Sequence, residues 1–350
     1  MKRARKAKRS YGSWATGKDV AAAAKVSLIT VSRAFSMPER LAPETLKRVQ
    51  KVAEDLGYIP NAVAGELSSR RSKVVAVVVP TLSNSNFART IEGLVARLNT
   101  DGYELLLSSS AFSPDREAEI VATLLERRPD GIVLIGNDHS PKLEKMVTAI
   151  GIPVVELWAL NGPILDMAVG FSDFDAMRSM TCHVLDQGRK YVGYVDFHTP
   201  GIRRYEERRN GFIAAVQANG CPDQLIFSSP AQKDYESGRL GLAALLEREP
   251  RLDAIIGCTD IHAAGAIFEC ARRGIHVPSV MSVAGFGDFE IAASIEPALT
   301  TIRSPAFEMG CHAASMLMAK IHGEDVSAKP KDVGFEIVLR DSVAPHASAA

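Results

Sequence analysis

From Val74 almost to its end, the chain alternates short apolar segments with segments of helical spacing, and this alternation constrains the fold more than any other feature. The first apolar segment, Val74–Pro80, shows no polar alternation, which is typical of a parallel strand buried on both faces. Two successive rounds of strand, helix and strand predict two doubly wound parallel sheets, and hence an α/β body over residues 73–350. The further predicted strands are Glu104–Ser108, Gly131–Ile135, Pro153–Leu157, Ala168–Phe171, Tyr191–Val195, Leu225–Phe227, Ala254–Cys258, Met281–Gly285, Leu299–Arg303 and Gly334–Leu339. The predicted helices are Phe87–Thr100, Asp115–Arg127, Lys142–Ile150, Phe174–Gln187, Tyr205–Asn219, Ser237–Arg248, Ala263–Arg273 and Pro305–His322.

This predicted body resembles the periplasmic-binding-protein fold, in which two lobes close on a ligand. The resemblance implies that the C-terminal elements cross back to complete the first lobe. In open α/β sheets a ligand binds at the carboxyl ends of the strands, in the crevice. No G-x-G-x-x-G or G-x-x-x-x-G-K-[ST] motif follows a predicted strand, so a nucleotide is not indicated.

The charge of the chain is unevenly distributed. Its 41 basic and 41 acidic residues cancel, but residues 1–72 hold 15 basic and 6 acidic residues, which leaves the remainder with 26 and 35. A basic head on an acidic body favours a polyanion-binding module joined to a second function. The first thirteen residues form a basic arm, which either adds nonspecific attraction to phosphates or is a solvated tail.

Several classes of protein find no support in the sequence. No apolar run reaches the length of a membrane helix, and the basic N-terminus lacks the apolar core of a signal peptide. The five cysteines are widely spaced, without C-x-x-C, which predicts free thiols in a reducing cytoplasm. No nucleophile elbow or metal-spaced His/Cys cluster appears, so we expect no enzyme, metal or cofactor.

Residues 14–60 read as three short helices. Asp19 is the predicted N-cap of the first and Ser27 that of the second, while Pro43 starts a third that stops at Gly57. Two helices a few residues apart predict a helix-turn-helix, whose second helix enters the DNA major groove by its N-terminal end. The alternative to DNA binding is a structural three-helix core with one solvent-exposed face.

On the second helix, polar and apolar side chains face the predicted groove together. Thr30 and Ser32 suit phosphate oxygens, and the Arg33 fork matches guanine O6 and N7. Leu28 and Ile29 lack hydrogen-bonding groups and suit thymine methyls. The predicted DNA-binding residues are Lys18, Ser27, Leu28, Ile29, Thr30, Ser32, Arg33, Asn61 and Leu67.

The run D-V-A-x-A-A-x-V-S-x-x-T-V-S-R, followed by P-E-T-x-x-x-V-x-x-x-A-x-x-L-G-Y-x-P-N, resembles the lactose-repressor (LacI/GalR) family of bacterial transcription regulators. One departure is Lys25, where the family has Gly, so Lys25 is expected to adopt a left-handed turn conformation. The resemblance implies that residues 61–72 are a hinge that orders on DNA and inserts a Leu, here Leu67, into the minor groove. A plain linker is the alternative reading.

The polar groups that follow the predicted strands are the candidates for the ligand site. Aromatic, amide, carboxylate and arginine side chains together suit a polyhydroxylated ligand. The resemblance implies that Arg208, Asn86 and Phe87 touch the effector, whereas Thr259-Asp260 and Asp288 depart from the family's pattern. The predicted effector-binding residues are Asn86, Phe87, Asn137, Trp158, Arg208, Lys233, Thr259, Asp260 and Asp288. Asp260 as a helix cap and Trp158 as core are the alternatives, and His139 and His262 are predicted to be capping or surface residues.

Three segments resemble the gluconate-operon repressor branch of the family: G-I-P-V-V-E-L-W from Gly151, L-D-M-A-V-G-F from Leu165 and A-I-F-E-C-x-R-x-G from Ala266. This resemblance implies a sugar-acid effector, such as gluconate, a ketogluconate or a phosphorylated form. We therefore predict a cytoplasmic, homodimeric repressor of sugar-acid genes that binds double-stranded operator DNA and does not enter a membrane. The alternatives are a solute-binding protein and a corepressor-type regulator for another small polar ligand. The sequence leaves a tetramer open, although the chain has no C-terminal heptad run that would form a tetramerising coiled coil.

Overall fold

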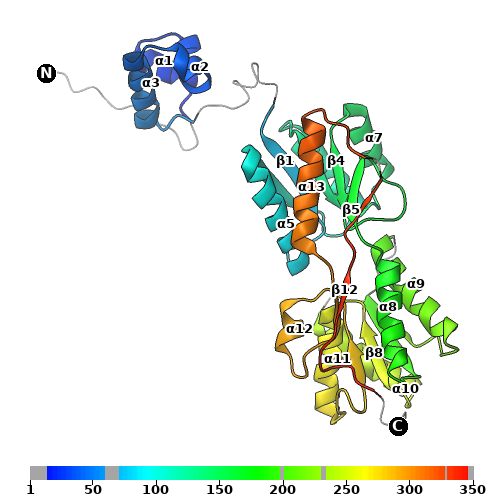
Figure 1. The fold of residues 1–350 in the computed structure, drawn as a ribbon. Helices are drawn as coiled ribbons and strands as arrows, with labels where there is room; N and C mark the ends of the chain where they lie inside the picture. The colour runs from blue at the N-terminus through cyan, green and yellow to red at the C-terminus, as the bar shows by residue number, and fades with distance from the viewer. Residues whose placement is uncertain (1–13, 60–70, 198–200, 230–233, 328, 346–350) are drawn as a thin grey trace. The chain divides into compact units, whose positions relative to one another are not determined.

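The computed structural model describes residues 14–59, 71–197, 201–229, 234–327 and 329–345 (Figure 1). The chain divides into two compact units, Met1–Ser72 and Lys73–Ala350. We call them the head and the body. Arg189, Tyr103 and Tyr194 are among the largest fully buried side chains, and all three belong to the body.

The head is a small helical unit of α1 (Gly17–Ala24), α2 (Leu28–Ser36), a 3-10 turn η1 (Pro38–Arg40) and α3 (Pro43–Leu56). Its core is built from small and β-branched residues at helical spacing, including Val20, Ala24, Val31, Val49 and Ala53. Such short side chains let three short helices approach one another closely, which explains how so few residues form a core.

Two predictions about the head have clear outcomes. The N-cap of α1 is Thr16 and not Asp19: Asp19 is the third helical residue, and the two side chains form a capping box. The prediction of Asp19 as the cap was therefore wrong by three residues. Lys25 does adopt the expected left-handed conformation, with φ 55°.

The first lobe of the body holds a six-stranded sheet in the order β11-β5-β4-β3-β1-β2, with the pairs parallel. Its strands are β1 (Val74–Val79), β2 (Glu104–Ser109), β3 (Gly131–Ile135), β4 (Val154–Leu157), β5 (Met167–Gly170) and β11 (Lys331–Asp332). Its helices and helical turns are α5 (Ser85–Leu98), η2 (Asn99–Asp101), α6 (Pro114–Leu125) and α7 (Pro141–Ile150). Residues 75–79 of β1 are fully buried because helices cover both faces, as the apolar run predicts.

The second lobe holds a four-stranded parallel sheet in the order β7-β6-β8-β9. Its strands are β6 (Val192–Phe197), β7 (Ile226–Ser229), β8 (Ala254–Gly257) and β9 (Ser282–Ala284). Its helices are α8 (Asp173–Asp186), α9 (Arg203–Ala218), α10 (Tyr235–Arg248), α11 (Asp260–Arg273) and α12 (Glu290–Ser294). The predicted helix from Ala263 thus begins three residues earlier.

The C-terminal elements join the two lobes. After β10 (Thr301–Arg303), helix α13 (Ala306–Ile321) packs along α5 of the first lobe, as Figure 1 shows. The two helices approach so closely that a Cβ on Gly93 would lie 2.0 Å from the Phe307 carbonyl oxygen, so only glycine fits there. The chain then pairs β11 with β5, returns through β12 (Glu336–Val338) antiparallel to β10, and bonds the Ser342 hydroxyl to the Val283 carbonyl in the second lobe.

Candidate DNA-reading helix and ligand crevice

Helix α2 presents an exposed row of side chains at its N-terminal end. Ser27 caps it, and the Ser27 hydroxyl accepts a hydrogen bond from the Thr30 amide at 3.1 Å. Leu28 and Ile29 are 49% and 64% exposed, an unusual position for large apolar side chains. Since Val31 and Ala34 are buried on the opposite side, α2 is held to the core while this row stays accessible.

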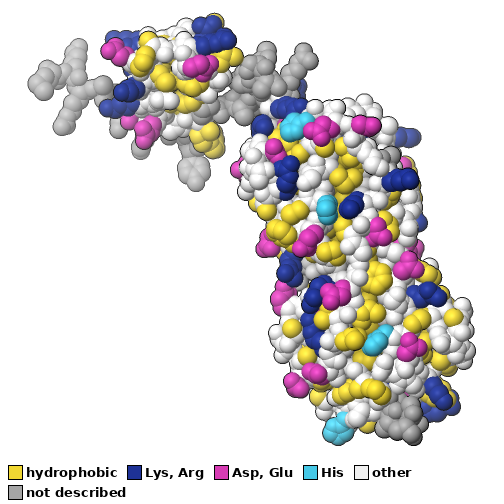
Figure 2. Space-filling view, viewed as in Figure 1, with side chains coloured by type: hydrophobic (Ala, Val, Ile, Leu, Met, Phe, Trp, Pro, Cys, Tyr) yellow, Lys and Arg dark blue, Asp and Glu magenta, His cyan; other side chains and the backbone are white. Residues whose placement is uncertain are grey.

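Polar side chains flank that apolar pair. Ser32, Arg33 and Lys18 are exposed, and Arg33 forms no ion pair within the described part of the chain. The Thr30 hydroxyl lies 2.9 Å from the Ser27 hydroxyl, so one of the two donates to the other. The visible face of the head also carries several Lys and Arg side chains (Figure 2). The predicted contacts Asn61 and Leu67 lie outside the described residues.

A hollow between the two lobes brings together residues from both sheets. We call it the crevice hollow. Five predicted effector residues line it: Asn86, Phe87, Trp158, Arg208 and Thr259. The Asn86 amide also donates to the Gly287 carbonyl at 2.7 Å, and this bond links α5 of the first lobe to the loop after β9 of the second.

Aromatic rings form one wall of the crevice hollow. The Phe87 and Trp158 rings meet edge to face with centroids 5.7 Å apart. Trp158 is 5% exposed and has φ 60°, an uncommon backbone conformation for a bulky residue. Its indole Nε1 is buried without a hydrogen-bond partner, and the residue lines both the crevice hollow and a second hollow.

Arg208 is held in place by groups of its own lobe. Its Nε donates to Asp173 at 2.6 Å, its Nη1 donates to the Cys258 carbonyl at 2.9 Å, and the guanidinium lies 3.5 Å over the Phe286 ring. Burial alone would lower the pKa of Arg208, but the Asp173 carboxylate raises it. The charge of Arg208 is therefore balanced by a neighbour, although its side chain lines the hollow.

Asn137 and Thr259, also among the predicted effector residues, form hydrogen bonds within their own lobes. The Asn137 amide donates to the carbonyls of Asn161 and Pro163, at 2.7 and 3.1 Å, beside the second hollow, which Asn137 and Trp158 both line. Thr259 is the N-cap of α11, and its hydroxyl lies 2.8 Å from His262 Nδ1.

The two predicted carboxylates point elsewhere. Asp260 accepts from the Phe289 amide at 2.7 Å and from the Thr301 hydroxyl at 2.5 Å, and burial raises its pKa to about 7 against the effect of those bonds. Asp288 forms 2.6 Å ion pairs with both Arg303 and Arg340. Neither carboxylate lines the crevice hollow. Lys233 lies outside the described residues.

The side chains of both histidines near the crevice are buried, so the predicted surface role was wrong, whereas His262 does bond to Thr259, the N-cap of α11. The His139 side chain is 2% exposed and lies between two carboxylates, 2.7 Å from Glu117 and 3.2 Å from Glu156. Burial would lower the pKa of His139, but the hydrogen bonds and charges of these carboxylates raise it to about 9. His262 is fully buried and stacks on Phe197, with ring centroids 5.7 Å apart.

Comparison with known proteins identifies the family of this fold. Residues 16–61 match the model of bacterial regulatory proteins of the lacI family, and residues 181–343 match the periplasmic binding protein-like domain. The HTH-type transcriptional regulator GntR of Escherichia coli is 34% identical over 323 residues, which cover 91% of this chain and 96% of that protein. The chain belongs to the LacI family.

Solved structures of LacI-family proteins agree with this assignment. A transcriptional regulator of the family from Silicibacter pomeroyi has a TM-score of 0.87 at 30% identity, covering 94% of this chain and 99% of its own. The regulator GntR from Chromobacterium violaceum has a TM-score of 0.74 at 32% identity, covering 77% and 99%. This LacI-family chain is therefore a DNA-binding transcriptional regulator, and the two-lobed α/β body with a helical head is confirmed.

The crevice of this LacI-family protein also contains residues that the sequence prediction did not select. Arg204, Tyr205, Phe286 and Phe289 line the crevice hollow. A signal for Arg204 was present, because it precedes Arg208 by four residues and so shares its face of a helix. The two phenylalanines follow β9 and carried no polar signal.

Two absences concern the described part of the chain. No group of three or more His, Cys, Asp and Glu side chains there is arranged to hold a metal ion. Nor does that part contain a helix with the length and hydropathy needed to cross a membrane.

Proposed function

We propose that this protein is a homodimeric repressor of sugar-acid catabolism genes, and that a sugar acid in the crevice weakens its hold on a pseudopalindromic operator. The observation that carries the proposal is the composition of the crevice. Aromatic walls, an amide and two buried guanidiniums, those of Arg204 and Arg208, converge on one hollow. Hydroxyl groups suit the amide and the indole donor, and a carboxylate suits an arginine.

The matches to GntR support the gluconate-operon branch, which the three segments resemble. Gluconate, ketogluconates and 6-phosphogluconate are the effectors to test first. A homodimer is expected because helix-turn-helix proteins of this kind place one recognition helix in each half-site of a two-fold operator.

The side chains assigned to DNA are Lys18, Ser27, Leu28, Ile29, Thr30, Ser32 and Arg33, together with Asn61 and Leu67 of the proposed hinge, residues 61–72. The exposure of Leu28, Ile29 and Arg33 supports this assignment. In the proposed complex Leu28 and Ile29 contact thymine methyls, and Arg33 contacts one guanine.

Two measurements test the proposed function. A thermal-shift screen of the sugar acids finds the effector, because a ligand that binds the folded state raises its stability. Titration of that ligand against a protein–operator complex then gives the sign of the coupling. Weakening of the operator complex is expected for an inducer, whereas strengthening would make the ligand a corepressor.

A solute-binding protein would share the two lobes, but it has no use for a helix-turn-helix that exposes Leu28 and Ile29. It would bind sugar acids with no effect of duplex DNA. Purified protein is further expected to leave the sugar acid chemically unchanged, and turnover would instead indicate an enzyme.

A further inference from the structure

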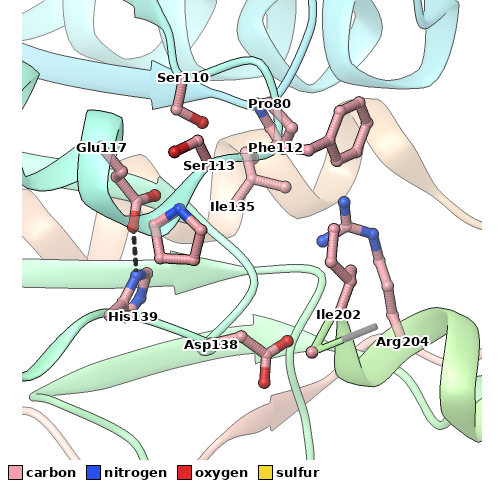
Figure 3. Close-up of a pocket in the computed structure, with 12 residues that line it drawn as sticks. Pro80, Ser110, Phe112, Ser113, Glu117, Ile135, Asp138, His139, Ile202 and Arg204 are labelled. Carbon is pink, nitrogen blue, oxygen red and sulfur yellow. Dashed lines mark hydrogen bonds and ion pairs between the residues drawn. The ribbon is translucent and has the colours of Figure 1, made fainter. Parts of the chain in front are cut away.

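Beside the crevice hollow lies another hollow at the start of α6, which we call the α6 hollow. Its lining includes Ser110, Phe112, Ser113, Asp138, His139 and Arg204, and its cavity volume is about 40 Å³. In Figure 3 the Arg204 guanidinium rises from α9 toward the Phe112 ring, while Ser110 and Ser113 lie across the hollow from it. Arg204 also lines the crevice hollow, so this side chain borders both.

Arg204 is the notable residue here, because its charge is buried without being balanced by a close carboxylate. It is 7% exposed, and its Nη2 has no hydrogen-bond partner. Its guanidinium lies 5.8 and 5.9 Å from the Phe87 and Phe112 ring centroids of the first lobe, and 5.0 Å from that of Tyr205. Within the described residues it forms no ion pair. A buried donor of this kind is costly unless a ligand supplies the acceptor.

The nearby carboxylates bond to partners other than Arg204. Glu117 bonds to His139 at 2.7 Å, and Asp138 accepts from the Arg203 amide at 2.7 Å. Asp173, whose pKa the charge of Arg204 lowers against the larger effect of burial, bonds to Arg208. Each of these acids therefore has a closer positive or donating partner than Arg204.

The opposite side of the α6 hollow is a helix N-terminus. Helix α6 begins at Pro114 with Ser113 as its N-cap, and the Ser113 hydroxyl accepts from the Arg116 amide at 3.3 Å. Pro114 has no N–H, and the Arg116 and Glu117 amides are bonded to the Ser113 hydroxyl and carbonyl, so it is mainly the positive end of the helix dipole that favours an anion at this place. Of the two acids in the first turn, Asp115 is exposed to solvent and Glu117 is taken by His139.

We propose that Arg204 and the first turn of α6 form an oxyanion subsite, which takes the carboxylate or phosphate end of the ligand while its hydroxyl-bearing chain lies in the crevice hollow. This inference rests on the proposed function and deepens it, since it assigns the recognition of the ligand's negative charge to Arg204 and not to Arg208. Arg204 reaches from the second lobe to rings of the first, so a ligand held there contacts both lobes at once.

The test is calorimetric titration of the full-length protein and its variant Arg204→Gln with four probes: glucitol, gluconate, 6-phosphogluconate and inorganic phosphate. The wild type is expected to bind one of the two acids about 10- to 100-fold more tightly than glucitol, as a charge-assisted hydrogen bond provides. Arg204→Gln should lose most of that preference and keep its affinity for glucitol. A loss confined to 6-phosphogluconate would place the phosphate in the subsite, and an equal loss for both acids would place the carboxylate there.

Arg178→Gln is the matched control, because Arg178 is exposed on α8 and lines none of the three hollows. It should leave every affinity unchanged. Should Arg204→Gln fold poorly, Arg204→Lys keeps the charge without the planar fork and should retain part of the preference.

The possible failures are distinguishable. If Arg204→Gln keeps the full preference for acids over glucitol, the subsite is contradicted and the proposed function stands. If the wild type shows no preference for either acid, the sugar-acid function is contradicted together with the subsite. Inorganic phosphate that binds the wild type and not Arg204→Gln would support the subsite.

Discussion

The head and the body present their functional side chains in opposite ways. In the head, Leu28, Ile29 and Arg33 stand exposed on one short helix, and their surroundings come from a few neighbouring residues. In the body, Arg204 and Arg208 are buried and lie between elements far apart in sequence. The head therefore exposes a preformed surface, whereas the body encloses a site whose polar groups are mostly bonded to one another. Substitutions should consequently affect binding in the head and stability in the body.

The largest effect is expected from Arg208→Ala. The variant leaves the Asp173 carboxylate buried without its partner, which should cost about 3–5 kcal/mol in the free energy of unfolding of the body. Urea unfolding followed by the fluorescence of the buried Trp158 measures it. Adding Asp173→Asn should recover part of the loss, because it removes the unpaired charge. A variant as stable as the wild type would mean that Arg208 is held by ligand and not by Asp173.

The next effect is a pH dependence of the body that originates at His139. The pKa of His139 is raised to about 9 in the folded protein, from about 6.5 in the unfolded chain. Protonated His139 therefore contributes about 3 kcal/mol to the free energy of unfolding below pH 6.5, and this contribution is lost as the pH rises through 9. Asp260, with a pKa of about 7, changes the slope of the free energy of unfolding against pH mainly below pH 7. The slope measured between pH 7 and 9 therefore reports mainly on His139. His139→Gln should be less stable at pH 7 and should show a flatter slope over that window. Equal slopes in the two proteins would remove His139 as the cause.

In the head, Arg33→Ala should cost about 1–3 kcal/mol of operator binding and relax the preference at one base pair, while stability stays unchanged. Binding to operators substituted at each position measures this. A uniform loss over all sequences would show that Arg33 contacts phosphate and reads no base.

The smallest effect is expected at the cap of α2. Ser27→Ala removes the acceptor for the Thr30 amide and should cost about 1 kcal/mol locally, or about fivefold faster hydrogen exchange in α2. Ser32→Ala is the control, since the Ser32 side chain lies outside the cap. Unfolding of the body should be unaffected in both, and a change there would end the distinction between the two units.

The same contrast explains which features the sequence could predict. The strands, helices and exposed row of α2 depend on local spacing, so the apolar run at Val74 and the cap at Ser27 were sufficient. The capping error at Asp19 was also local: Thr16 and Asp19 both have cap chemistry, and only the backbone at Thr16 distinguishes them.

The partners of the buried groups could not be predicted. Nothing near Asp288 in sequence shows that Arg303 and Arg340 neutralise it, and nothing near His139 indicates that Glu117 and Glu156 enclose it. These contacts depend on how distant elements cross. The role proposed for Arg204 could not be predicted either. The lack of a hydrogen-bond partner for its Nη2 becomes apparent only once the partners of the nearby carboxylates are known.

Occupancy of the crevice and occupancy of the operator are expected to be coupled, and the reciprocity of that coupling tests this expectation most directly. The affinity for gluconate or 6-phosphogluconate is measured by titration with and without saturating operator duplex. We expect operator to weaken effector binding by the same factor, about 5- to 150-fold, by which effector weakens operator binding. Equal effector affinities with and without operator would contradict it.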